Sequence, residues 1–236
     1  MRSTAEGAGN ITSPNSLVLY LDAANSRSYP GSGATWYDIS GNNNHFTLFA
    51  TPTFTGKSIN FNGTTQYGQC VNTTFGNFGT GSFTIEQIYN ASSSQQYGPI
   101  LMKKSSLANG PDTFRPGWAF NPGGLFRVAP DGAASIDYSS TAYTSINVHM
   151  AHTIERNGNS ITGSIYVNGA LASSTAQATF GGNNSVDNAL NTRLMLSYGQ
   201  GQYRSGSVYL VRAYNTVVSS EDIYQNFTVL RSRFNL

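Results

Sequence analysis

Apolar and polar residues alternate along several short stretches of this chain, with the two-residue period of a half-buried β-strand. In residues 82–91, Phe83, Ile85 and Tyr89 lie on one face of such a strand. Residues 147–155 alternate in the same way. Polar turn residues separate each stretch from its neighbours. The pattern therefore predicts a protein built from β-strands.

Further short strands are predicted wherever apolar or β-branched residues stand between Gly-, Asn- and Pro-rich turns. These are residues 17–22, 35–39, 46–48, 58–61, 67–71, 99–103, 118–120, 125–128, 135–138, 160–168, 170–174 and 192–196. Asn-Gly pairs at 62–63, 157–158 and 168–169 supply the positive φ that tight hairpins need. No alternation of strands with helices is visible. Short strands with regular turns favour an all-β sandwich of antiparallel sheets.

The end of the chain departs from this alternation. Residues 206–214 are nearly apolar on both faces, which is typical of a central strand covered on both sides, or of one whose outer face meets a partner. One helix is then predicted, with Ser219 as N-cap and Asp222 three residues later. Ile223, Phe227 and Leu230 would form its buried stripe.

Composition narrows the classes of function. The chain has 236 residues, a net charge of +2 and only 10% charged residues, without the basic stripe that nucleic-acid binding requires. A single cysteine, Cys70, excludes an internal disulfide framework, and we expect it to be a buried apolar residue. No segment is long and apolar enough to span a bilayer. Residues 1–15 are polar, lack the apolar centre of a signal peptide, and are predicted to form an N-terminal arm before one domain at 16–236.

Four stretches resemble the laminin-G-like branch of the concanavalin A-like lectin/glucanase superfamily, as found in tailed-phage structural proteins. They lie at residues 21–42, with Trp36 and Asp38 between Gly-rich turns, at 58–67, at 148–169, and at 206–227. The resemblance implies a jelly-roll β-sandwich of two antiparallel sheets with one short C-terminal helix. Its lectins, hydrolases and structural modules share that fold, so the fold alone does not choose a function.

Two departures from the family pattern concern the closing strand. Tyr209 and Leu210 stand where relatives commonly have acidic residues. This replacement favours contact with another protein, and a buried core position explains it equally well. We therefore take Tyr209 and Leu210 as candidates for an assembly interface.

Catalytic and metal-binding patterns are sparse. Hydrolases of this fold carry paired carboxylates on one strand, and none of the four glutamates has an acidic neighbour two residues away on a strand. His149 and His152 are three apart on a strand, so they project to opposite faces and cannot share a metal. Relatives bind Ca²⁺ at the sandwich rim, and Asn183, Asn184 and Asp187 are the weak candidates for such a site. We expect a protein that is not an enzyme and needs no cofactor.

Carbohydrate binding requires aromatic platforms beside amide-bearing loops. Tyr97, Trp118, Tyr198 and Tyr203 lie near loops rich in Gln, Asn and Gly and are the candidates for such platforms. An exposed set of tyrosines could equally form a protein interface.

The first hypothesis for function is a non-enzymatic virion protein that decorates the exterior of a phage capsid. It would be made in the host cytoplasm, contact the major capsid protein or other virion proteins, form a homo-oligomer on the particle, and bind host-surface glycans. The alternative is a glycan-binding receptor-recognition module of a tail or fibre. A polysaccharide hydrolase is the third hypothesis.

Overall fold

The computed structural model describes residues 14–92, 100–104, 117–121, 125–130, 136–158, 160–178, 185–197 and 201–236. Within these ranges the chain forms a short 3-10 turn, sixteen strands and a C-terminal helix. In order they are η1 (Pro14–Ser16), β1 (Leu17–Asp22), β2 (Thr35–Trp36), β3 (Phe46–Phe49), β4 (Thr53–Phe54), β5 (Ile59–Asn62), β6 (Tyr67–Cys70), β7 (Phe83–Ala91), β8 (Leu101–Lys103), β9 (Gly117–Asn121), β10 (Leu125–Ala129), β11 (Ile136–Ser139), β12 (Val148–Asn157), β13 (Ser160–Val167), β14 (Ala170–Ala178), β15 (Arg193–Leu194), β16 (Ser205–Tyr214) and α1 (Ser220–Phe234).

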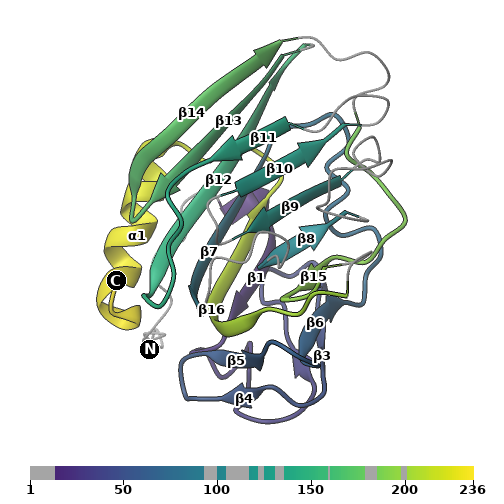
Figure 1. Cartoon of the computed structure of the whole chain (residues 1–236), viewed down its shortest axis with the longest axis vertical. Helices are drawn as coiled ribbons and strands as arrows, with labels where there is room; N and C mark the ends of the chain where they lie inside the picture. Colours follow the sequence, from purple (N-terminus) through teal and green to yellow (C-terminus); the bar gives the residue numbers. More distant parts are fainter. Residues whose placement is uncertain are drawn as a thin grey trace, which may run out of the picture.

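The strands form two antiparallel sheets packed face to face (Figure 1). The first sheet has the order β14-β13-β12-β7-β16-β5-β4, and β1 pairs with the other half of β16. The second sheet has the order β11-β10-β9-β8-β15-β6-β3-β2. The predicted all-β sandwich with one C-terminal helix is confirmed.

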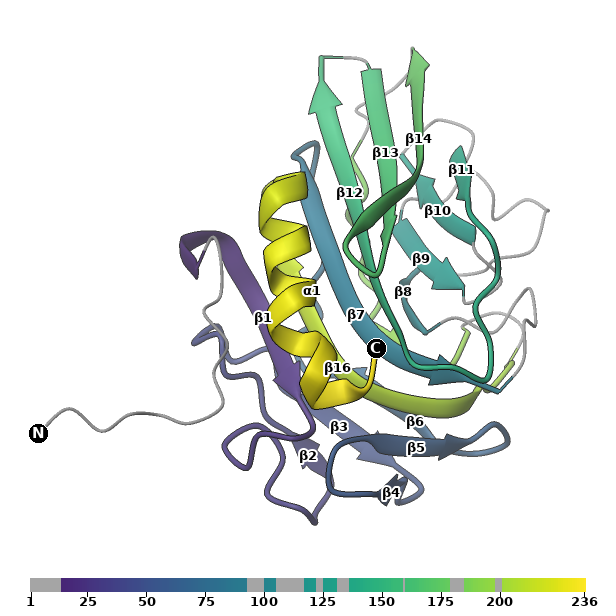
Figure 2. The same ribbon diagram turned by 90° about the vertical axis from the view of Figure 1, so that its left-hand side faces the viewer.

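The first sheet is covered on both faces. Its inner face packs against the second sheet around a large apolar core that includes Trp36, Phe46 and Trp118. Its outer face packs against α1, which lies across β1, β16 and β7 in Figure 2. A separate apolar cluster, with Ile88 and Leu230 among its members, fills that second interface. The molecule is therefore three layers deep along α1.

The opening stretch is held by local side-chain contacts, as its turn residues predict. The Asp38 carboxylate accepts hydrogen bonds from the backbone N–H groups of Tyr20, Ser40 and Asn44 at 2.8–2.9 Å. Asp22 accepts one from the N–H of Ala24 at 3.0 Å. Residues 1–13 lie outside the described residues, so the N-terminal arm stays a prediction.

Helix α1 begins as predicted and buries a different stripe. The Ser219 side chain accepts a hydrogen bond from the backbone N–H of Asp222 at 3.1 Å, which caps the helix. Ile223 and Leu230 are buried, and Phe227 is only half-buried. Phe234 and the polar residue Asn226 are the other two buried positions. The sequence pattern missed Asn226 because its partner is a charge on the sheet below.

Candidate functional site

Of the four residues predicted to bind sugar, Tyr203 is the one that lies within the described residues and is partly exposed. It is half-buried and forms an isolated β-bridge with Leu196 after β15. Its ring centroid lies 6.1 Å from that of Tyr67 in β6. The bridge therefore brings Tyr203 over the second sheet rather than leaving it at the end of a free loop.

Tyr67 continues this contact into a stacked aromatic pair. Its ring lies 4.5 Å from the ring of Phe49 at an interplanar angle of 4°. The two residues are cross-strand partners in β3 and β6. Alternation explains their position, because Phe46, Leu48, Gly68 and Cys70 of the same strands are buried while Phe49 and Tyr67 face outward.

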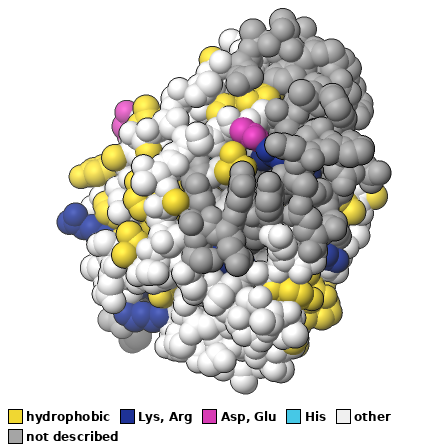
Figure 3. Space-filling model, viewed as in Figure 1, with side chains coloured by type: hydrophobic (Ala, Val, Ile, Leu, Met, Phe, Trp, Pro, Cys, Tyr) yellow, Lys and Arg dark blue, Asp and Glu magenta, His cyan; other side chains and the backbone are white. Residues whose placement is uncertain are grey.

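Polar groups border these rings on the same face. The Arg193 Nε donates a hydrogen bond to the Gln69 Oε1 at 3.1 Å, and the two residues pair across β15 and β6. The Arg193 guanidinium carbon lies 5.8 Å from the Tyr67 ring centroid. We call Phe49, Tyr67, Tyr203, Gln69 and Arg193 the aromatic surface. A hydrophobic patch is visible over β3 and β6 at the lower right of Figure 3.

Trp118 does not belong to a binding surface. It is fully buried, and its indole N–H donates to the Gly76 carbonyl at 2.9 Å. Its ring packs near Phe83 and Phe120 in the core between the sheets. The prediction of Trp118 as an exposed platform is wrong, because its position in β9 points inward. Tyr97 and Tyr198 lie outside the described residues.

Tyr209 and Leu210 contact this chain's own helix. A bulge in β16 between Val208 and Leu210 shifts the register against β7. Leu210 is fully buried, and both residues pack into the cluster beneath α1. The Tyr209 ring meets Phe234 edge-to-face at 5.7 Å. The assembly-interface prediction for these residues is corrected: α1 already covers that face of β16.

The candidate metal residues are only partly described. Asn183 and Asn184 lie outside the described residues. Asp187 is exposed, and its Oδ1 accepts a hydrogen bond from the backbone N–H of Gly79 at 2.6 Å. No group of three or more His, Cys, Asp or Glu side chains is placed to hold an ion in the part of the chain that the structure describes.

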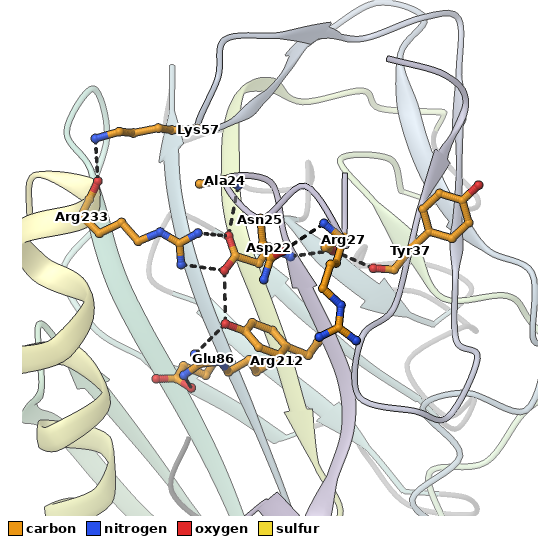
Figure 4. A network of polar contacts seen from close by, with 11 residues as sticks. Asp22, Ala24, Asn25, Arg27, Tyr37, Lys57, Glu86, Arg212 and Arg233 are labelled. Atoms are coloured by element: carbon orange, nitrogen blue, oxygen red, sulfur yellow. Dashed lines mark hydrogen bonds and ion pairs between the residues drawn. The ribbon is translucent and has the colours of Figure 1, made fainter. Parts of the chain in front are cut away.

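Glu86 of β7 belongs to a buried polar network between the first sheet and α1, and it lies at one end of the part of that network drawn in Figure 4. Its Oε1 is 2.7 Å from His149 Nε2, and its Oε2 is 3.4 Å from an Arg212 guanidinium nitrogen. The Tyr214 hydroxyl and the Asn226 amide of α1 also donate to Oε2, at 3.2 and 3.3 Å. Burial opposes the charge, but Arg212 and these hydrogen bonds outweigh it and hold the pKa of Glu86 below its ordinary value.

The network continues to the end of the helix. Arg212 donates to the Tyr20 hydroxyl at 3.2 Å, and that hydroxyl donates to Asp22 at 3.2 Å. Arg233 then binds both oxygens of Asp22, at 2.7 and 2.9 Å, as Figure 4 shows. Charged groups thus connect β7, β16, β1 and α1.

This network is structural. Glu86, Arg212 and His149 are each at most 1% exposed, so a substrate cannot reach the carboxylate. The expectation that His149 and His152 face opposite sides is confirmed, and both are buried, one below α1 and one against Phe120 and Phe126 in the core. Sequence reasoning missed the network because, apart from the Tyr20–Asp22 bond, its partners lie 63 to 211 positions apart.

Cys70 is buried in the core, as expected. Burial raises the pKa of its thiol to about 12, so the thiolate that reacts or binds metal is not formed near neutral pH.

Two antiparallel sheets with a helix on one outer face define a lectin-like β-sandwich. The model of the concanavalin A-like lectin/glucanases superfamily matches residues 62–224. The chain belongs to this superfamily, which confirms the resemblance at the level of the superfamily. A search of curated proteins gives no match.

Solved structures with the same fold come from larger chains. A Trypanosoma rangeli sialidase in complex with the inhibitor DANA superposes with a TM-score of 0.61 at 18% identity, over 89% of this chain and 32% of its own. The binding domain of Paraclostridial mosquitocidal protein 1 gives 0.58 at 14% identity, over 94% and 53%. The botulinum neurotoxin type G receptor binding domain gives 0.60 at 11% identity, over 90% and 51%. This chain spans about a third to a half of those chains, and the likeness is one of fold.

No helix among the described residues has the length and hydropathy needed to cross a membrane.

Proposed function

We propose that this chain is a non-catalytic carbohydrate-binding module that holds a glycan against the aromatic surface. One observation carries the proposal: Phe49, Tyr67 and Tyr203 gather on an outward face of the second sheet, next to Gln69 and Arg193. Aromatic faces supply apolar area for the C–H side of a sugar ring, while amide and guanidinium groups bond its hydroxyls. Strands rather than loops carry Phe49, Tyr67, Gln69 and Arg193, which reduces the ordering cost of binding.

The burial of Glu86 supports a role without catalysis. Glycoside hydrolysis needs two carboxyl groups that both reach the scissile bond. Glu86 is closed off below α1, and Glu221 and Asp222 occupy the first turn of that helix, where they favour the helix dipole. Glu155 is exposed at the end of β12. If this chain were a polysaccharide hydrolase, it would turn over a polysaccharide, and the Glu155→Gln variant would lose that turnover.

A glycan array with the full chain, followed by titration calorimetry on the best ligand, tests the proposal. We expect Tyr67→Ala and Tyr203→Ala each to weaken binding by about 10-fold, which corresponds to about 1.4 kcal/mol. Tyr224→Ala is the matched control, because Tyr224 is exposed on the outer side of α1. The proposal fails if no glycan binds, or if all three variants bind alike while their unfolding midpoints match the parent.

That this chain decorates the exterior of a phage capsid is a separate proposal. The burial of Leu210 removes the closing strand as an attachment face, so residues 1–15 remain the segment predicted to contact a shell. Mixing the full chain and a chain lacking residues 1–13 with capsids that lack this protein tests the proposal. Association of the full chain alone at physiological salt is expected, and no association of either chain would contradict it.

A further inference from the structure

A cavity of about 290 Å³ opens at the rim of the sandwich, where the two sheets end together. Val18 of β1 and Asn215, which follows β16, form its wall on the first sheet. The loops before β3 and after β6 form its wall on the second sheet. The aromatic surface begins at Phe49 and Tyr67, the opposite ends of β3 and β6, so the two places are distinct.

The lining of this rim cavity is polar and carries no charge. Five of its ten residues are asparagines, and the others are Thr74, Gly76 and three apolar residues. Asn42, Asn77 and Asn215 are exposed. The Asn77 Nδ2 and the whole side-chain amide of Asn215 have no hydrogen-bond partner among the described residues. The cavity therefore offers amide donors and acceptors that are ready for a ligand.

The wall behind these amides is fixed by buried hydrogen bonds. Asn44 donates to the Val18 carbonyl at 2.7 Å and accepts from the Asn72 amide at 2.8 Å, which joins the two sheets at the rim. Lys103 Nζ donates to the carbonyls of Thr73 and Leu190, each at 2.6 Å. These bonds hold the loop after β6 in one conformation before any ligand arrives.

Core side chains also hold the centre of that loop. Thr192 Oγ1 donates to the Phe75 carbonyl at 3.0 Å, and Trp118 donates to the Gly76 carbonyl at 2.9 Å. Gly76 has a φ of +83°, and a Cβ at this position would lie 2.8 Å from the Trp118 ring. Phe78 stacks on Phe83 at 4.3 Å and supplies an apolar wall of the cavity.

A second cavity of about 390 Å³ adjoins the first through Thr74 and Asn77, which line both. Asp187 and Asn188 stand on its other side. Asp187 is the only charged residue in either lining, and its negative charge disfavours an anionic ligand there.

We propose that the rim cavity is a second glycan site, which binds an uncharged sugar, with the adjoining cavity taking the next unit of the chain. Each sugar hydroxyl both donates and accepts a hydrogen bond, and a side-chain amide offers one group of each kind. A lining without cations gives no pairing for a phosphate, sulfate or carboxylate group, so such ligands would lose their hydration without compensation. The site goes beyond the aromatic surface and does not depend on it.

The test is an NMR titration of the full chain with neutral di- and trisaccharides of glucose, mannose, galactose and N-acetylglucosamine, and with sialylated and sulfated counterparts. We expect a neutral sugar to shift the side-chain amide signals of Asn77 and Asn215. Asn77→Ala and Asn215→Ala should each weaken its binding about 3- to 10-fold, the effect of one or two lost hydrogen bonds. Asn215 is exposed, so Asn215→Ala should unfold at the parent temperature. Asn77→Ala also removes the acceptor of the Asn188 backbone N–H at 3.1 Å and should unfold at a slightly lower temperature.

Two control variants separate this site from the aromatic surface. Tyr203→Ala removes a ring of the aromatic surface, and Gln225→Ala removes an exposed amide of α1 that lines neither cavity. Both should leave the titration unchanged. The proposal is overturned if no neutral sugar shifts the asparagine signals, if charged sugars bind more tightly, or if both asparagine variants bind like the parent. Loss of binding on Tyr203→Ala alone would place the sugar on the aromatic surface and leave only the first proposal standing.

Discussion

His152 shows how a single buried side chain makes stability depend on pH. It lies in the core with its ring 4.3 Å from Phe120 and 5.2 Å from Phe126. Burial, with a smaller contribution from His149, lowers the pKa of His152 from 6.5 to about 3. The imidazole is therefore neutral in the folded protein and takes up a proton only on unfolding near pH 5.

Because the unfolded chain binds this proton more tightly, the free energy of unfolding should fall as the pH is lowered from 6.5 toward 3. The loss is on the order of a few kcal/mol over that range. Urea unfolding at pH 7.5, 6 and 5 measures it before most carboxylates titrate. We expect His152→Leu to flatten this dependence. An equally steep loss in the variant would assign it to another group.

Trp118 and Tyr203 mark the limit of residue-level prediction for the site. Both are aromatic residues near polar loops, and sequence alone could not separate them. Trp118 lies on the inward side of β9, whereas a bridge to Leu196 holds Tyr203 on the outer side of the second sheet. Tyr67 was not among the predicted sugar-binding residues. The alternation within β6 shows that Tyr67 faces outward, but it does not show which neighbouring strands bring Phe49 and Arg193 beside it.

Among the larger elements, α1 shows which features of a helix its own residues encode. Its cap, its acidic first turn with Glu221 and Asp222, and its basic last turn are all local signals. Its docking is not local, because Asn226 and Arg233 find their partners in β7 and β1.

The cap can be tested with neighbouring serines. Ser219→Ala removes the hydrogen bond to the Asp222 N–H and should lower the free energy of unfolding by about 1 kcal/mol. Ser220→Ala changes the first residue of the helix without removing the cap and should cost less than half as much. Thermal unfolding by circular dichroism compares them. Equal losses for the two variants would contradict the role of Ser219.

Strand β16 shows what an apolar pattern leaves open. Both predicted explanations, a strand covered on both sides or one meeting a partner, fit its sequence. The structure places the core of the sandwich on one side and α1 on the other. The charged residue within the strand, Arg212, is paired with Glu86 in the second interface. Both members of this ion pair belong to the first sheet, and the helix is tied to the network by Asn226, which donates to Glu86, and by Arg233, which binds Asp22.

At the scale of the whole molecule, the first sheet belongs to both apolar interfaces, so the layers should unfold together. We expect one transition in urea, with the fluorescence of Trp36 and Trp118 and the helical dichroism signal falling at the same midpoint.

Glu86→Gln leaves Arg212 buried without its counter-charge. The variant should have a lower shared midpoint, with a free energy of unfolding reduced by about 3–5 kcal/mol. Glu221→Gln, on the exposed first turn of α1, is the control. Loss of the helix signal before the fluorescence change would show that α1 unfolds separately.

The amino-acid sequence is enough to predict the all-β class, most of the strands, the hairpin turns, the capped helix and the superfamily. Each of these depends on residues close together in the chain, or on a pattern of such segments. The tertiary structure is needed to show that the first sheet is covered on both faces, and that three aromatic rings meet on the outer face of the second sheet. It alone also brought the asparagines of three separate segments around one cavity at the rim. Those outcomes depend on the order of strands within the sheets, in which β7 pairs with β12 and β16 from distant parts of the chain. No local sequence pattern encodes this strand order, because the order follows from burying both apolar clusters, the one between the sheets and the one beneath α1, at the same time.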